Sequence, residues 1–161
     1  MGIINKKQKI FLIFVIFFLL FVFLYNPNTK VTKSNIISDF NSVKQVAIND
    51  AIFSVVVVAD DFSRMKGLSG VEYLSSDQGM LFVFEYSGIY PFWMKDMLIP
   101  IDIIWINEDF KIVYIEVNLN PNTYPKSFGP KQETSRFVLE VSAGIVNMFD
   151  IKIGDTVYFL N

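Results

Sequence analysis

Lys95, Asp96 and Asp102 stand inside one dense apolar run, residues 79–107, and they are the side chains best placed to do chemistry. Ionised groups are expensive to bury unless they are paired or face water. Three of them in one apolar block therefore predict either the rim of a pocket or an internal polar cluster. Neither pattern by itself names a reaction.

An aromatic wall with a few convergent polar groups is the usual form of a site for a small ligand or a sugar. Here a tryptophan would supply the wall, a basic side chain the positive charge, and an aspartate the hydrogen-bond acceptor. The alternative is structural, because Pro100 separates two strand-like segments that could form a hairpin with a Lys–Asp pair near its mouth. The candidate ligand-binding residues are Arg64, Trp93, Lys95, Asp96 and Asp102, with Trp105 as a second choice for the wall.

Residue types that are missing narrow the chemistry further. The chain has no Cys and no His, which excludes disulfides, thiolate nucleophiles, zinc–thiolate sites and hydrolases of the usual Ser–His–Asp or Cys–His kind. Acid–base work on a glycan would need two carboxylates, for which Asp96 and Asp102 are candidates, with Glu85 or Glu140 as partners. No cofactor motif or metal-ligand pattern appears, so we expect neither, and we favour a protein that is not an enzyme.

The elements that must position these residues are mostly strands. Short β-branched and aromatic segments predict about eight of them after residue 42, with a hairpin turn at residues 107–110. Two short helices are expected, one capped by Asp60 and ending near Gly67, and one over residues 142–149 capped by Ser142. The fold class is therefore mainly β (α+β), a compact antiparallel barrel or sandwich. The strands are expected at residues 43–48, 52–59, 80–85, 91–97, 101–107, 111–118, 136–141 and 155–160.

The N-terminal part carries a different signal. Residues 10–25 are sixteen apolar residues without a break, preceded by three lysines. As a helix they would extend about 24 Å, close to the hydrocarbon thickness of a bilayer, and no small-residue cleavage pattern follows them. We expect a cytoplasmic basic terminus (1–9), a transmembrane signal-anchor helix (10–25), a tether (26–42) and an extracytoplasmic β domain (43–161). Secretion after signal-peptide cleavage is the alternative to this single-pass placement in the cell membrane.

The charge of the β domain bears on its partners. After residue 42 there are nine Lys and Arg against 15 Asp and Glu, a formal charge of −6. This acidic balance argues against nucleic-acid binding. The expected partners are the membrane and a small polar ligand, a glycan or an envelope protein.

Several motifs of the β domain occur in a fixed order along the chain. They are Arg64-x-x-Gly67-Leu68, GMLFVF at 79–84, FWMKDMLIPID at 92–102, RFVLEV at 136–141, Ala143-Gly144 and Ile153-Gly154-Asp155. Together they resemble the DUF192 family (domain of unknown function 192) over about residues 44–160. The resemblance implies a small, mainly β domain that is commonly exported or membrane-anchored, and it implies no established activity.

The sequence therefore favours an uncharacterised membrane-anchored domain that acts as a noncatalytic binding or accessory module. A hydrolase or lyase using Asp, Glu or Lys on envelope material is one alternative, and a structural partner of a membrane complex is another. A binding module requires a pocket, an enzyme also requires two carboxylates around a cleft, and an interaction protein requires a contiguous exposed apolar patch.

Overall fold

The computed structural model of the chain describes residue 40 and residues 42–161. The predicted anchor helix at residues 10–25, and the tether but for its last residues, lie outside this part. Among the described residues, no helix combines the length and the apolar character that crossing a membrane requires. The elements are β1 (Gln45–Ile48), β2 (Ala51–Val58), α3 (Asp61–Lys66), β3 (Gln78–Gly88), β4 (Phe92–Trp93), β5 (Ile101–Ile106), β6 (Ile112–Leu119), η1 (Pro121–Thr123), β7 (Ser127–Phe128), β8 (Ser135–Ser142), α4 (Ile145–Met148) and β9 (Val157–Leu160).

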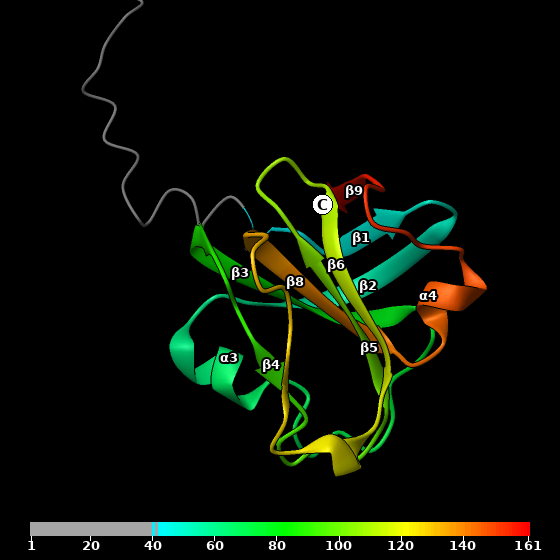
Figure 1. The fold of residues 1–161 in the computed structure, drawn as a ribbon. Helices are drawn as coiled ribbons and strands as arrows, with labels where there is room; N and C mark the ends of the chain where they lie inside the picture. The colour runs from blue at the N-terminus through cyan, green and yellow to red at the C-terminus, as the bar shows by residue number, and fades with distance from the viewer. Residues whose placement is uncertain (1–39, 41) are drawn as a thin grey trace, which may run out of the picture. The chain divides into compact units, whose positions relative to one another are not determined.

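Seven of these strands form one curled sheet in the order β6-β5-β8-β3-β2-β1-β9, while β4 and β7 form a separate two-stranded sheet. The two edges of the seven-stranded sheet approach each other near β6 and β9. The backbone N–H of Ile112 donates to the carbonyl of Asp155, and the N–H of Val157 donates to the carbonyl of Phe110. The sheet is thus rolled into a half-barrel (Figure 1). The predicted mainly β class with two short α-helices is confirmed, although β2 and β3 pair in parallel rather than antiparallel.

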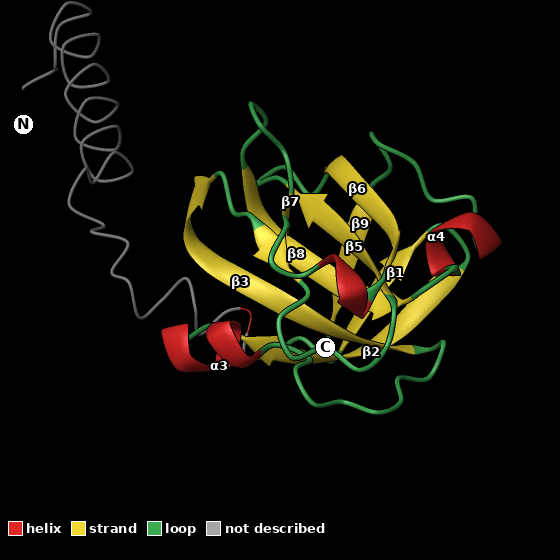
Figure 2. Cartoon of the chain, turned by 60° about the horizontal axis from the view of Figure 1, so that its bottom comes forward, coloured by secondary structure: helices red, strands yellow, loops and turns green. Residues whose placement is uncertain are grey.

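Both faces of the sheet are apolar, and this explains why all six residues of β5 are buried. Alternate residues of a strand point to opposite faces. On one face, Ile104 of β5 and Leu139 of β8 pack into a core inside the curl of the sheet. On the other, Trp105 and Val138 pack under an outer layer that includes Leu68, Met94 and Met97. Figure 2 shows α3 and α4 at opposite ends of the sheet.

The helix ends are set by short local contacts. Asp60 caps α3 by accepting a hydrogen bond from the backbone N–H of Ser63 at 2.9 Å, and Gly67 ends it with a φ of 49°, as expected. The predicted cap of the second helix is wrong. α4 begins at Ile145 after Gly144, whose φ of 91° turns the chain, and it has no side-chain cap at its N-cap position. Ser142 instead ends strand β8.

One predicted hairpin is wrong as well. The segment after Pro91 has only two strand residues, and these pair with β7 and not with β5. Strand β5 pairs with β6 and β8, so Lys95 and Asp102 do not face each other across a hairpin. The turn at residues 107–110 is confirmed, because the N–H of Phe110 donates to the carbonyl of Asn107 between the antiparallel strands β5 and β6.

Candidate functional site

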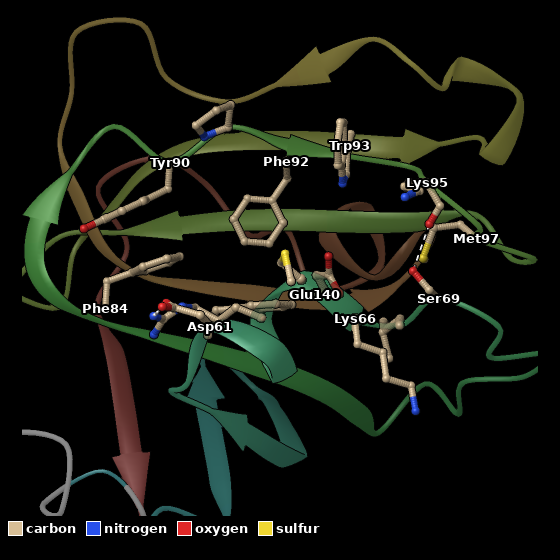
Figure 3. A pocket seen from close by; sticks show the side chains of 16 residues that line it. Asp61, Lys66, Ser69, Phe84, Tyr90, Phe92, Trp93, Lys95, Met97 and Glu140 are labelled. Atoms are coloured by element: carbon tan, nitrogen blue, oxygen red, sulfur yellow. Dashed lines mark hydrogen bonds and ion pairs between the residues drawn. The ribbon is translucent and has the colours of Figure 1, made fainter.

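A cleft of about 720 Å³ lies between the outer layer and the second face of the sheet. Its walls are α3 with the residues that follow it, the even-numbered residues of β3, and the segment that leads through β4 (Figure 3). Cavities of this size accommodate small-molecule ligands. The lining residues are Asp61, Arg64, Met65, Lys66, Gly67, Leu68, Ser69, Phe82, Phe84, Tyr90, Pro91, Phe92, Trp93, Lys95, Met97 and Glu140.

The Arg64-x-x-Gly67-Leu68 motif builds one wall of the cleft. The Arg64 guanidinium donates to the carbonyls of Ala59 and Val83, the latter at 2.9 Å, and thereby ties α3 to the end of β2 and the middle of β3. Gly67 supplies the positive φ that ends the helix, a conformation that costs side-chain-bearing residues free energy. Leu68 is buried in the second core. The motif is therefore the scaffold of this wall.

The second wall is tied to the first by two hydrogen bonds. The Ser69 hydroxyl donates to the carbonyl of Lys95 at 2.9 Å, a contact drawn in Figure 3. The backbone N–H of Gly70 donates to the carbonyl of Asp96, also at 2.9 Å. Asp96 has a φ of 55°, which Asp and Asn adopt more readily than most residues. The local geometry explains an aspartate at this place without any contact to a ligand.

Aromatic rings form most of the apolar surface. Phe82 and Phe92 meet edge to face with centroids 4.8 Å apart, and Phe84 stacks on Tyr90 at 3.6 Å. Trp93 is 51% exposed at the mouth of the cleft. Its indole therefore offers a flat face to an incoming molecule, of the kind that packs on sugar rings or planar groups.

Glu140 is the polar group on the floor of the cleft. It stands on β8 opposite Met80 of β3 and Ile103 of β5, and only 4% of its surface is exposed. Burial raises the pKa of its carboxyl to about 8, so the group is largely protonated at neutral pH. Its Oε2 has no hydrogen-bond partner among the described residues. Figure 3 shows the carboxyl directed toward the space below Phe92.

The basic residues of the cleft differ in how much of their charge is already used. The Arg64 guanidinium forms an ion pair with Asp61 and lies 5.1 Å from the centre of the Phe84 ring. Lys66 and Lys95 have no ion pair within the described part of the chain. The Lys95 amine lies 5.9 Å from the centre of the Trp93 ring. Figure 3 shows the Lys66 amine directed away from the cleft, so the free positive charge at its mouth sits on Lys95.

The structure brings together three of the five predicted site residues. Arg64, Trp93 and Lys95 all line the cleft, whereas Asp96 and Asp102 do not. Asp102 lies on the opposite face of the sheet, because it shares its side of β5 with Ile104. It is fully buried, and its carboxylate accepts hydrogen bonds from the backbone N–H groups of Asn118 at 2.7 Å and Val146 at 2.9 Å.

Two further assignments follow from the same alternation. Trp105, the second choice for the wall, is fully buried and its indole N–H donates to the carbonyl of Tyr90 at 2.8 Å. It supports the cleft from beneath and does not line it. Glu140 entered the sequence interpretation only as a partner carboxylate. The signal that could have placed it is the apolar strand of residues 137–141, whose single charge shares a face with Val138.

Other chemistry finds less support in this geometry. Within residue 40 and residues 42–161, no three carboxylates gather closely enough to hold a metal ion. Two carboxylic acids do line the cleft, but Asp61 is exposed and already paired with Arg64. Glu140 is therefore the one acid in the cleft, among the described residues, whose oxygen is left without a partner.

Comparison with known proteins agrees with the fold. The model of DUF192, a family described as uncharacterized ACR, matches residues 44–159. A crystal structure of a protein of unknown function from Novosphingobium aromaticivorans DSM 12444 is 26% identical, with a TM-score of 0.67, and covers 72% of this chain and 84% of that one. A protein from Sinorhizobium meliloti 1021, described as a candidate transcription regulator, is 28% identical with a TM-score of 0.67 and covers 71% and 92%. No curated protein matches the chain.

Proposed function

The chain belongs to the DUF192 family, whose description states no activity, and we propose that it is a noncatalytic module that binds a small polar ligand in the cleft. The observation that carries this proposal is the partnerless, buried Oε2 of Glu140 on the floor of an aromatic cavity. A buried polar atom without a partner costs free energy, and a ligand that pairs with it recovers that cost.

The remaining contacts of the cleft fit binding better than catalysis. A glycosidase requires two carboxyl groups at a defined separation around the bond that breaks. Here Asp61 is neutralised by Arg64, and Asp102 supports the backbone on the other face of the sheet. Aromatic walls around one polar group instead orient a ligand without transforming it.

We further propose that the domain is held at the outer side of the cell membrane by the anchor at residues 10–25. The sixteen-residue apolar run and the lysines before it support this placement. A tether of about 17 residues would let the cleft reach ligands near the membrane surface.

A ligand screen tests the binding function. The full-length protein in mild detergent is heated with small sugars, amino acids and organic acids, and the melting temperature is recorded for wild type, Trp93→Ala and Lys95→Ala. Lys131→Ala, at an exposed lysine outside the cleft, is the matched control. We expect at least one compound to raise the melting temperature of wild type and the control but not of the two cleft variants. Compounds that stabilise all four proteins equally, or none at all, contradict the proposal.

The placement has its own test, because the chain contains no Cys. A single Lys131→Cys substitution introduces one thiol on the exposed surface of the β domain. A membrane-impermeant maleimide added to intact cells should label this thiol, and the labelled protein should be found in the membrane fraction. Labelling only after lysis would place the domain inside, and labelled protein in the medium would favour cleavage.

A further inference from the structure

The charges that line the cleft restrict the class of ligand that it accepts, if the proposed binding function holds. The ion pair between Asp61 and Arg64 cancels two of them. Of the two unpaired lysines, Lys95 lies at the mouth and Lys66 points away from the cleft, and the carboxyl on the floor is mostly neutral at pH 7. The cleft is therefore positive by about one charge, which attracts anions and repels amines.

The floor of the cleft offers a hydrogen-bond donor. A protonated carboxyl group has one O–H donor, whereas an ionised carboxylate can only accept. A carboxylic acid kept neutral by an apolar site can donate a hydrogen bond at pH 7, as in the oxyanion hole of ketosteroid isomerase. Glu140 meets this condition, because apolar residues flank it on both neighbouring strands and its Oε2 has no partner among the described residues.

The donor and the free positive charge are separated along the cleft. The Lys95 amine lies beside Trp93 at the mouth, whereas Glu140 lies on the floor, as Figure 3 shows. The rings of Phe82 and Phe92, which meet edge to face, add apolar surface to the same cleft, and Figure 3 shows Phe92 above the floor. A molecule that satisfied both ends would need a negative group, a flat or weakly polar body, and an acceptor oxygen at its far side.

We propose that the ligand is an organic anion with a second, uncharged acceptor oxygen, such as a hydroxylated aromatic acid or a sugar acid. Glu140 donates to the acceptor oxygen, the rings pack on the body, and Lys95 pairs with the negative charge. The ring could be aromatic or a sugar, since both stack on indole and phenyl faces. An organic cation would instead meet the like charge of Lys95.

Ionisation of Glu140 should weaken the binding of such a ligand, because the hydrogen-bond donor becomes an acceptor. The other charged or titratable groups around the cleft are Asp61, Arg64 and Lys66 on α3 and Tyr90 and Lys95 on the segment through β4. The neighbouring strands present only Met80 and Ile103 to Glu140. One pH unit above the pKa, about one molecule in eleven keeps the proton, which weakens apparent affinity about tenfold.

Two matched pairs of probes test the ligand class. In each pair the body and the hydroxyl groups are similar and the charge is opposite: 4-hydroxyphenylacetate with tyramine, and glucuronate with glucosamine. Calorimetric titrations of the full-length protein at pH 6.5 and pH 9 give the dissociation constants. We expect one anion to bind at least tenfold more tightly than its cationic counterpart at pH 6.5, and to lose about tenfold at pH 9. The pair that responds identifies the body.

Variants assign the two contacts. Glu140→Gln keeps a hydrogen-bond donor, so the variant should still bind the anion at pH 6.5 and should not lose affinity at pH 9. Glu140→Met fills a similar volume without a donor and should weaken binding at least tenfold, with its circular dichroism confirming the fold. Lys95→Ala should weaken the binding of the anion, and Lys131→Ala should leave it unchanged. If Glu140→Met binds the anion as tightly as wild type, and this binding still depends on Lys95, the donor role of Glu140 is overturned.

Three other results contradict the ligand class. Tighter binding of tyramine or glucosamine would identify an amine site, and so would affinity that rises between pH 6.5 and pH 9. If neither pair binds at 10 mM, approximately the weakest affinity that this titration detects, while the thermal screen yields a cleft ligand of another class, the anion proposal fails alone. If that screen also yields nothing, the binding function fails with it.

Discussion

The ionisation of Glu140 should leave a measurable mark on stability, independent of any ligand. Burial raises the pKa of this carboxyl from 4.5 to about 8 in the folded protein. Below pH 4.5 the group is protonated in both the folded and the unfolded chain, and its contribution is then constant. Between pH 4.5 and pH 8 the folded state binds a proton that the unfolded state has released, so stability falls as pH rises. Above pH 8 the contribution is again constant.

The size of the effect follows from the same two values. Each unit of difference in pKa corresponds to about 1.4 kcal/mol, so this group alone should lower the free energy of unfolding by on the order of 5 kcal/mol across that range. Many domains of this size have only about 5–15 kcal/mol of stability. Glu140→Gln removes the ionisation and keeps a similar volume, so the variant should be several kcal/mol more stable than wild type at pH 9.

Urea denaturation of residues 40–161, followed by tryptophan fluorescence, provides the measurement. Phe40 is included because its ring packs on Phe137 and Phe159. We expect the difference between Glu140→Gln and wild type to be small at pH 5 and to grow steadily up to pH 8, with equal m-values. The raised pKa of Tyr90 and Tyr114 lies above this range. Parallel profiles for the two proteins from pH 5 to pH 9 would refute the reasoning.

Four other substitutions, with Asp109→Ala as a control, separate supporting residues from contact residues, each measured as the change in urea midpoint. Asp102→Ala should cost about 2–5 kcal/mol, because two backbone N–H groups lose their acceptor, whereas Asp109→Ala in an exposed turn should change stability by less than about 0.5 kcal/mol. Arg64→Met should cost about 2 kcal/mol through two unpaired carbonyls, and an unchanged midpoint would show that they are solvated. Gly67→Ala should cost about 1–3 kcal/mol because of its positive φ, and a stabilised variant would contradict this account. Trp93→Ala should alter stability by less than about 1 kcal/mol while removing a cleft wall, and a larger loss would make Trp93 a structural residue.

Much of the fold could be predicted because local residue patterns indicate strands and turns. The β-branched run at residues 52–58 and the turn at 107–110 carry their structure in neighbouring residues, and both are found where expected. The parallel pairing of β2 with β3 could not be predicted, because it depends on α3 and the 67–77 segment crossing between them. Register is likewise set by contacts between distant segments, which no local pattern specifies.

The candidate site was predictable only where alternation along a strand was enough. Alternation alone puts Ile104 and Asp102 on one face of β5, and the structure places that face away from the cleft. The error came from assuming a hairpin around Pro100, since Met94 and Met97 instead belong to the outer layer that packs on the sheet. Glu140 was hard to weigh, because one charge in an apolar strand signals a site only when the covering layer is known.

The pairing of the first and last strands has a consequence for how the protein is made. β1 pairs with β9 along its whole length, from Ile48 with Val157 to Gln45 with Leu160. The domain therefore cannot complete its sheet until residues 157–160 have been made, whatever order the other strands adopt. Contacts between such distant segments slow folding into the millisecond-to-second range. Until β9 pairs, the β1 edge and its apolar residues are open to association with other chains, so an unpaired β1 edge is a site for aggregation during folding.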